Sequence, residues 1–339
     1  MAGNQAAWLD GKGEKLRVGP AEMPKPGPDE VVIRNHAIAV NPVDWKVQDY
    51  GVMVQRWPTL MGGDIAGEIV EVGTDVKNLK KGDRVMAHVA SLLTQKTQEA
   101  GFQLYTCAPA ATTAVVPGSI SYADASVLPL CFDTAVVGMC SEKERGYLGL
   151  PFPSLNPKPC SKVIVVWGGS SAVGANVIQL SVAAGAKVIA TASSHNFDFC
   201  KGCGASEVFD YKSSSIADEV AKAVKSAGGE FAGVYDAISI LDQSMKPCFD
   251  ILEKLGGGNM AVVLPPPEDK PSGVTIGQVL GWSPLTHGLW KSYITQALEE
   301  GKLKCMPPAV IIGKGLEAIQ NGLDENKKGV SAKKVVIEL

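Results

Sequence analysis

The segment from Lys162 to Ala192 constrains the fold of this chain more than any other. It reads KVIVVW, GGSSAVG, ANVIQLSVAAG and, one residue later, KVIATA. Two apolar runs rich in β-branched residues flank a stretch whose apolar residues recur at helical spacing. This order predicts a strand, a glycine turn, a helix and a second strand. Two strands joined through one helix form a βαβ unit, and such a unit implies a parallel sheet.

The same alternation continues beyond this unit. Apolar strand-like runs alternate with helical stretches over EVFDY (207–211), residues 216–224, GVYDAIS (233–239), residues 243–254 and NMAVVL (259–264). Repeated alternation of this kind is typical of a doubly wound parallel sheet with helices on both faces. The fold class is therefore predicted to be α/β in this part of the chain.

The flanking parts differ from the middle. Residues 1 to about 120 contain short β-branched runs, such as Val31 to Val40, punctuated by glycine and proline, which predicts a small antiparallel barrel. The end of the chain predicts helices over 289–303 and 314–323 and a closing strand over 333–339. We expect this tail to rejoin the barrel. The predicted domains are 1–122 with 290–339, and 123–289.

Composition excludes several partners. The 339 residues include 32 Lys+Arg and 35 Asp+Glu, so the net charge of −3 argues against nucleic acid. No stretch approaches about 18 uninterrupted apolar residues and the start lacks a signal pattern, so we predict a cytoplasmic protein with no membrane partner. The eight cysteines do not suggest a disulfide scaffold, and Cys200 with Cys203 is interpreted as the end of a helix.

The glycine turn is the strongest chemical signal. Glycines in such a turn allow a sharp exit from the strand and let the backbone approach a pyrophosphate, which the helix N-terminus stabilises. The spacing GGxxxxG differs from the usual GxGxxG, and a turn without a ligand is the alternative. The predicted pyrophosphate site comprises Gly168, Gly169, Ser170, Ser171, Ala172 and Val173, with Gly174 packing the helix against the sheet.

The end of the second strand indicates which nucleotide binds. NAD sites usually place an acidic residue there for the ribose 2′-hydroxyl. This chain instead has Ser193, Ser194, His195 and Asn196, and the nearest acid is Asp198. A carboxylate beside a 2′-phosphate would cost roughly 4 kcal/mol per unit charge at about 4 Å. Its absence favours NADP(H) as the cofactor.

Several motifs together resemble the medium-chain dehydrogenase/reductase superfamily over essentially the full length. They are NPVDWK (41–46), GGDIAGEIVEVG (62–73), KKGDRV (80–85), LPLCFDTA (128–135), WGGSS (167–171), SSHNFD (193–198) and FDYK (209–212). Within the superfamily they resemble zinc-free fungal trans-acting enoyl reductases and the proteins named zinc-binding-dehydrogenase-like, which are similar to quinone oxidoreductases. The resemblance implies a GroES-like β-barrel domain joined to a Rossmann domain.

The superfamily includes zinc alcohol dehydrogenases, so the resemblance also bears on metal. Their catalytic zinc uses a Cys where this chain has Asn41 and a His where it has Gly63. Cys131 lies near the remaining ligand position, and one thiol cannot hold the ion. The polar interval that carries the structural zinc in those enzymes contains no cysteine here. We therefore predict that no metal binds.

The resemblance implies a reaction and its residues. NADPH would deliver hydride to a C=C conjugated to a carbonyl in an enoyl thioester, enone or quinone. Lys46 and Thr134 are the predicted catalytic residues, Lys46 contacting the ribose or steadying the enolate. The other predicted cofactor contacts are Asn41, Val43, Asp44, Trp45, Tyr211, Val263, Leu264, Val330 and Ser331.

Three questions stay open in the sequence. The substrate is a small molecule or a carrier-tethered enoyl chain, the latter with a polyketide synthase as partner. A quinone oxidoreductase and a silent NADPH-binding sensor or scaffold are the alternatives. The chain is a monomer or a homodimer, and the run PPP at 265–267 favours the monomer because prolines often blunt a sheet edge.

Overall fold

The computed structural model of the chain describes residues 3–339. The chain forms two compact units. The first comprises residues up to Leu130 together with Trp290–Glu299 and Lys304–Leu339, and the second comprises Cys131–Leu289 with Glu300–Leu303. Two of the boundaries between the units fall within helices, one in α4 (Pro129–Cys140) and one in α9 (His287–Ser292). The domain bounds derived from the sequence stay a prediction.

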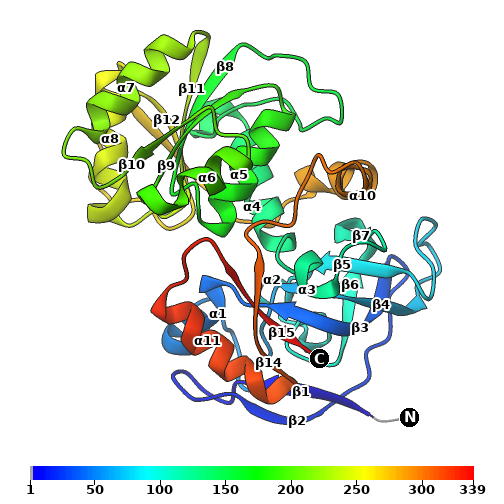
Figure 1. Cartoon of the computed structure of the whole chain (residues 1–339). Helices are drawn as coiled ribbons and strands as arrows, with labels where there is room; N and C mark the ends of the chain where they lie inside the picture. Colours follow the sequence, from blue (N-terminus) through cyan, green and yellow to red (C-terminus); the bar gives the residue numbers. More distant parts are fainter. Residues whose placement is uncertain (1–2) are drawn as a thin grey trace. The chain divides into compact units, whose positions relative to one another are not determined.

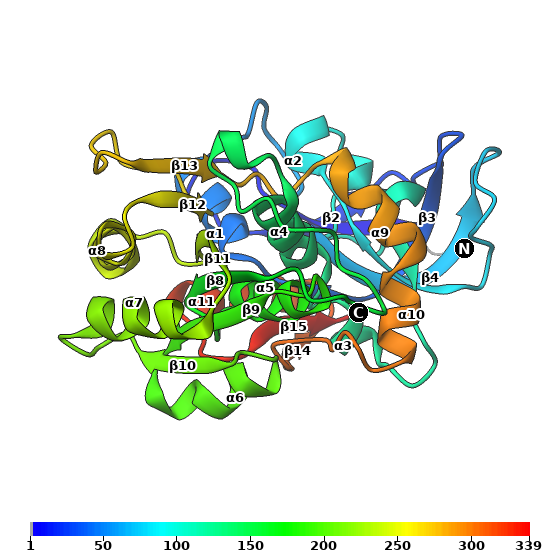
Figure 2. The same ribbon diagram turned by 90° about the horizontal axis from the view of Figure 1, so that it is seen from above.

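The second unit is built on a six-stranded parallel sheet in the order β10-β9-β8-β11-β12-β13. Figure 2 shows the strands side by side in this spatial order, from β13 through β8 to β10. The predicted doubly wound parallel sheet is confirmed. The strands are β8 (Lys162–Trp167), β9 (Lys187–Ala192), β10 (Glu207–Asp210), β11 (Glu230–Asp236), β12 (Gly258–Val262) and β13 (Val274–Gln278).

Helices lie on both sides of this sheet, with α5 and α6 on one side and α7 and α8 on the other (Figure 1). The amphipathic helix α7 buries Val220 and Val224 against strand residues such as Val165 and Val234. This burial removes the apolar stripe of the helix from water and fixes it on the sheet. The helices are α5 (Ala172–Ala183), α6 (Phe197–Gly202), α7 (Ile216–Ala227) and α8 (Lys246–Lys254).

The edge of this sheet differs from the prediction. The prolines at 265–267 lie between β12 and β13, so they do not form the sheet edge. The edge strand on this side of the sheet is β13, which contains no proline. The interpretation of the proline run as an edge breaker is therefore wrong, because a strand that the sequence did not suggest pairs beyond it. The oligomeric state stays a prediction.

The first unit contains a seven-stranded sheet in the order β14-β15-β3-β4-β5-β7, with β6 also pairing with β3. A two-stranded sheet, β1-β2, accompanies it. These are the strands of the predicted GroES-like barrel. They are β1 (Asn4–Trp8), β2 (Arg17–Ala21), β3 (Glu30–Ala39), β4 (Asp64–Val72), β5 (Arg84–His88), β6 (Tyr105–Pro109), β7 (Thr113–Val115), β14 (Ala309–Lys314) and β15 (Lys334–Glu338).

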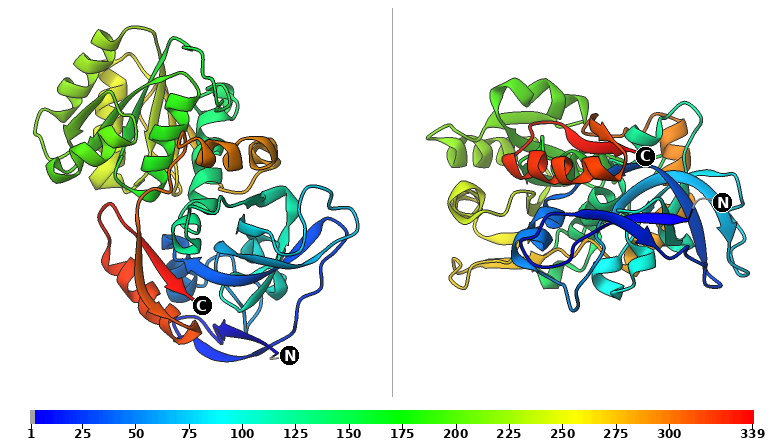
Figure 3. Two further views of the ribbon diagram at one scale, coloured as in Figure 1. Left: turned by 45° about the vertical axis from the view of Figure 1, so that its right-hand side comes forward. Right: turned by 90° about the horizontal axis from the view of Figure 1, so that it is seen from below.

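The tail completes this sheet. β15 pairs with β14 on one side and with the second half of β3 on the other, while β6 pairs with the first half of β3. Figure 3 shows the C-terminal segment in red beside the N-terminal strands in blue. The helices of this unit are α1 (Pro42–Tyr50), α2 (Ser91–Thr94), α3 (Tyr122–Ala125), α10 (Ile294–Glu299) and α11 (Ile319–Lys328).

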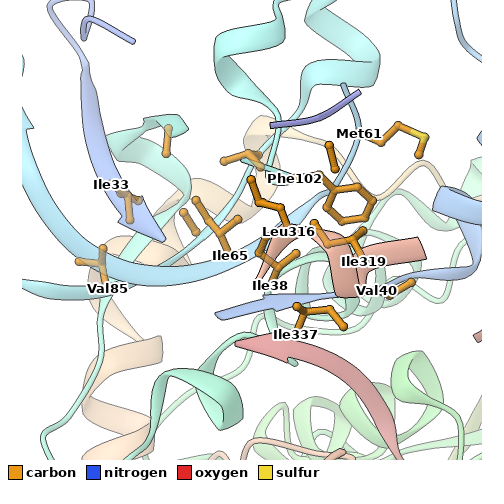
Figure 4. Packing of buried hydrophobic residues seen from close by; sticks show 14 of the residues in the cluster. Ile33, Ile38, Val40, Met61, Ile65, Val85, Phe102, Leu316, Ile319 and Ile337 are labelled. Carbon is orange, nitrogen blue, oxygen red and sulfur yellow. The ribbon is translucent and has the colours of Figure 1, made fainter. Parts of the chain in front are cut away.

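The core of the first unit joins residues from both ends of the chain. Ile33, Ile65 and Phe102 pack with Ile319 and Ile337 from the tail, and all are fully buried (Figure 4). The tail therefore contributes to the same hydrophobic core as the N-terminal strands. Its removal would expose that core to water.

Two further features concern the helices. The stretch Tyr122–Cys140, which includes α3 and α4, has the length and the mean hydropathy of 1.4 of a membrane-crossing helix. However, 83% of its apolar window is buried inside the protein, as is typical of a core helix. Cys200 lies in α6 and Cys203 directly follows that helix, as predicted, and both side chains are buried.

Candidate functional site

The loops that follow the strands of the six-stranded sheet form the first candidate site. The chain passes from β8 to β9 and β10 on one side, then returns to β11 and continues outward on the other. The strand order therefore reverses between β8 and β11. Doubly wound sheets bind their ligands at the carboxyl ends of the strands at such a switch point.

In the glycine turn after β8, the start of α5 packs closely against the backbone at the end of the strand. Gly168 has a φ of +76°, which favours glycine. A Cβ on Gly174 would lie 2.2 Å from the Gly168 carbonyl oxygen, so the helix can approach the turn only without a side chain there. Ser171 caps α5, because its side chain accepts the Gly174 N–H at 3.0 Å. The first N–H groups of α5 can thus face an anion.

The turn after β9 extends this edge with polar groups. Asn196 donates from Nδ2 to Ser170 Oγ at 3.2 Å, which joins this turn to the glycine turn. Ser193 donates to the Tyr211 hydroxyl at 3.3 Å, so the ends of β9 and β10 are also joined. Ser194 and His195 are exposed, as is Tyr211. The structure thus brings the predicted residues after β8, β9 and β10 to one edge.

Lys212 is a candidate that the sequence analysis missed. Its Nζ lies 5.8 Å from the centroid of the Tyr211 ring, and the side chain is exposed. A cation beside Ser193 and Tyr211 suits a 2′-phosphate better than neutral donors alone. The motif FDYK contained this residue, but only the pairing of β10 with β9 locates it beside Ser193.

The ends of β11 and β12 add a buried polar cluster that the sequence did not predict. Asp236 accepts the backbone N–H groups of Ile238 and Ser239 at 3.0 and 2.9 Å. Burial raises the pKa of the Asp236 carboxyl. Ser239 Oγ accepts the Val263 N–H at 2.8 Å and thereby ties the loop after β12 to the loop after β11. Leu264, the next predicted contact, follows in this loop.

Helix α1 of the first unit carries the predicted catalytic lysine. Lys46 is half-buried, and its Nζ lies 5.5 Å from the centroid of the Trp45 ring. Burial lowers the pKa of the Lys46 ammonium. Among residues 3–339 it makes no hydrogen bond or ion pair. Lys327 lies near the same ring at 5.9 Å, but it forms an ion pair with Asp49 at 2.6 Å.

A buried ion cluster lies at the start of α1. Lys334, from β15, donates to Asn41 Oδ1 at 2.5 Å and lies 3.2 Å from Asp64 Oδ2. Asn41 in turn donates from Nδ2 to the same Asp64 oxygen at 2.7 Å. The other Asp64 oxygen accepts the Leu130 N–H at 2.6 Å. Lys334 and Asp64 are 3% and 0% exposed, so this pair is shielded from water.

Asp44 adds a second buried carboxyl beside this cluster. Its Oδ2 accepts the Asn41 N–H at 2.7 Å and so closes the first turn of α1. Its Oδ1 is buried without a hydrogen-bond partner in the described part of the chain. Burial raises the pKa of Asp44 from 3.8 to about 7. Asn41 and Asp44 thus direct their polar groups into the unit, whereas Val43, Trp45 and Lys46 are only half-buried.

These donors do not fit a zinc ion. The oxygens of Asn41 and Asp64 are directed at an ammonium or at N–H groups, and Gly63 has no side chain. A divalent ion about 4 Å from the ammonium would be repelled by roughly 8 kcal/mol at an effective dielectric constant of 20. Zinc sites also require three or four deprotonated ligands. No group of three or more His, Cys, Asp or Glu suited to a metal occurs within residues 3–339.

The remaining predicted residues lie elsewhere. Thr134 is buried in α4, and its carbonyl oxygen accepts the hydroxyl of the buried Tyr235 at 2.7 Å. Val330 and Ser331 are exposed in the loop between α11 and β15, four and three residues before Lys334, respectively. Their contact with a cofactor stays a prediction, as it does for Thr134 and the residues of α1.

The chain is similar to two protein families along most of its length. Residues 27–128 match the family described as alcohol dehydrogenase GroES-like domain. Residues 172–281 match the family described as zinc-binding dehydrogenase. The first match covers most strands of the seven-stranded sheet, and the second begins at α5.

Individual proteins match over the whole chain. The dehydrogenase orsE of Emericella nidulans is 47% identical, with 100% of both chains covered. The trans-enoyl reductase himH of Aspergillus japonicus is 41% identical over 99% of this chain and 97% of its own. A mycobacterial protein solved in complex with NADPH has the same fold, with a TM-score of 0.73 at 19% identity over 99% of this chain and 100% of its own.

Proposed function

The chain belongs to the medium-chain dehydrogenase/reductase superfamily, and on this premise we propose that it is an NADPH-dependent, zinc-independent reductase of activated double bonds. Its substrates contain a C=C conjugated to a carbonyl, as in an enoyl thioester, an enone or a quinone. A carrier-tethered enoyl chain of a polyketide synthase is the favoured form, because a relative with 41% identity is a trans-enoyl reductase.

The edge of the six-stranded sheet supports NADP(H) as the cofactor. The glycine turn and the N-terminus of α5 suit the pyrophosphate, since backbone N–H groups and the helix dipole favour an anion there. Ser193, Tyr211 and Lys212 suit the 2′-phosphate, and no carboxylate follows β9 directly. When bound, NADPH supplies the hydride that reduces the double bond.

One observation carries the proposal that the reductase works without metal: the buried Lys334 ammonium between Asn41 and Asp64. The Lys334 ammonium occupies the side-chain oxygens of Asn41 and Asp64, which a metal ion at this place would need as ligands. Polarisation of a substrate carbonyl by a zinc ion is therefore replaced by donors of the protein. A reaction that needs only hydride and a proton suits such a site better than alcohol oxidation does.

Lys46 is the proposed donor toward the developing enolate. Its ammonium lacks a carboxylate partner among the described residues, so its charge is not neutralised within the first unit. Burial lowers its pKa, which makes it a better proton donor than an exposed lysine. Thr134 is proposed to hold the nicotinamide end of the cofactor through its hydroxyl.

The test is a pair of titrations on the purified chain. Nucleotide fluorescence is expected to show NADPH binding more tightly than NADH, and Lys212→Ala should weaken NADPH binding about 10-fold while NADH is unaffected. Lys222→Ala, an exposed lysine of α7, is the matched control. Equal affinity for NADH and NADPH would refute the cofactor assignment.

Turnover is then followed by NADPH absorbance with crotonyl-N-acetylcysteamine, a cyclic enone and a quinone. Consumption with the enoyl thioester alone supports the enoyl reductase, and consumption with the quinone alone supports a quinone oxidoreductase instead. Tight NADPH binding without consumption on any of the three would favour a sensor and contradict the proposal. Elemental analysis is expected to find well under one zinc per chain, and a stoichiometric zinc would contradict it as well.

A further inference from the structure

The Lys334 cluster has a second consequence, which rests on the proposed function. We propose that Lys334 is a positioning residue for helix α1 and, through it, for Lys46. The ammonium does not act on the substrate itself. It fixes Asn41, the residue from which α1 begins, and thereby the helix that carries the proposed proton donor.

The bonds of the cluster converge on the starts of two helices. Asn41 is the N-cap residue of α1, and its side chain is held by Lys334 and Asp64. Leu130, in the first turn of α4, donates its N–H to Asp64. Lys334 lies in β15 and Asp64 in β4, so both helix starts are attached to the same sheet. A displacement of the ammonium would be transmitted to Asn41 directly.

The charges of the cluster favour this arrangement. Asp44 and Asp64 contribute two buried carboxyl groups, and Lys334 contributes one ammonium. Each helix N-terminus carries roughly half a positive charge, and Asp44 and Asp64 each lie at one of them. The charge of Asp64 is therefore balanced by the Lys334 ammonium, while burial favours the protonated form of Asp44 up to about pH 7. Removal of the ammonium alone would leave a buried carboxylate without its compensating charge.

Trp45 offers a readout of α1 that does not depend on catalysis. Trp45 lies four residues after Asn41, and the ammonium groups of Lys46 and Lys327 lie 5.5 and 5.9 Å from the centroid of its ring. In chain labelled with 5-fluorotryptophan, the ¹⁹F signal of Trp45 is assigned by its loss in Trp45→Phe. A shift of α1 relative to Lys327, which belongs to α11, changes this signal.

The principal variants are Lys334→Met and the double variant Lys334→Met with Asp64→Asn. The single variant is expected to lower the Tm by roughly 10 °C, because it leaves a buried charge unpaired. The double variant removes both charges and should regain most of the Tm. In both, the Trp45 signal should move and kcat should fall about 10-fold, with KM for NADPH unchanged. Lys314→Met, which breaks an exposed ion pair on β14, is the matched control and should alter none of these.

Two results would overturn the inference. The first is a folded double variant whose Trp45 signal and kcat both match the wild type, since Lys334 would then serve charge balance alone. The second concerns Asn41→Ala, which keeps the Lys334–Asp64 pair but removes the link to α1; an unmoved Trp45 signal there contradicts the inference even if neither Lys334 variant folds. A wild-type chain that consumes no NADPH refutes the proposed function, whereas the Trp45 signal still decides the role of Lys334.

Discussion

At the scale of single residues, local motifs were predictable and tertiary partners were not. The glycine turn could be predicted because its requirement is local: a sharp strand exit followed by a helix. The buried contacts of Lys334 could not be predicted, because its partners Asn41 and Asp64 lie about 290 and 270 positions away in the sequence. Only the pairing of β15 with β3 brings these residues together. Lys212 lies inside the motif FDYK, but its proposed role follows only from the pairing of β10 with β9.

Gly174→Ala is expected to disrupt the turn. Its Cβ would meet the Gly168 carbonyl oxygen at 2.2 Å, so the helix must move away from the strand end. We expect a loss of about 3 kcal/mol in the free energy of unfolding and at least about 10-fold weaker NADPH binding. Urea unfolding and nucleotide titration measure the two effects. Gly202→Ala is the control, since a Cβ there meets no atom within 4 Å; equal behaviour of the two variants would contradict the prediction.

Lys46→Met is expected to lower kcat about 100-fold, because a hydrogen-bond donor to the enolate is lost. Lys327→Met is the matched control: this lysine contacts the same Trp45 ring but is paired with Asp49, a hydrogen bond that raises its pKa. Activity should also fall with rising pH as Lys46 loses its proton, below the ordinary pKa of 10.5. A pH profile of kcat/KM tests this, and identical profiles for both methionine variants would disprove it.

At the scale of elements, regular alternation was predictable and short or irregular elements were not. The strands β8, β9 and β12 and the helices α5 and α7 follow clear periodic patterns. Helix α1 does not follow such a pattern, because its sequence PVDWKVQDY mixes apolar and polar residues. The helix buries Asp44 and Gln48 and has no continuous apolar stripe. Strand β13 follows a proline-rich loop, and β14 is only partly buried, so neither carries a strong hydrophobic signal.

The start of α1 should make stability depend on pH. The folded state retains the Asp44 proton up to about pH 7, whereas an unfolded chain releases it near pH 3.8. This contribution to stability is present below pH 3.8 and is lost as the pH rises to 7. The difference in free energy of unfolding between Asp44→Asn and the wild type should therefore shift in favour of the variant by up to about 4 kcal/mol between pH 4 and pH 8. Urea unfolding at several pH values provides the measurement, and parallel profiles would rule out the raised pKa.

At the scale of the whole molecule, the sequence indicated a parallel-sheet region inserted into a β-rich one, because the two kinds of pattern alternate along the chain. The units agree with that order, since the first is assembled from segments on both sides of the second. The four-residue segment Glu300–Leu303, which belongs to the second unit, could not be foreseen, because no periodicity distinguishes it from the helix before it.

Ile337→Ala tests whether the tail supports the first unit. Ile337 is fully buried in the core of that unit, so its truncation should cost about 3 kcal/mol of unfolding free energy. NADPH affinity of the folded protein should stay unchanged, because Ile337 is a core residue and is not one of the predicted cofactor contacts. Ile311→Ala on the neighbouring β14 is the control, since that side chain is 48% exposed and should change stability by about 0.5 kcal/mol at most. A comparable loss in both variants would show that burial of Ile337 is not the cause.

The central place of β15 also bears on biosynthesis. On the ribosome, the glycine-turn unit can close as soon as residue 303 has emerged, whereas β3 must wait for residues 334–338 before its second half gains a neighbour on that edge. During this interval the apolar side chains that will surround Ile337 lack one wall of their enclosure. Nascent chains of this topology therefore expose the apolar side chains of their earliest strands to aggregation until residues 334–338 have emerged.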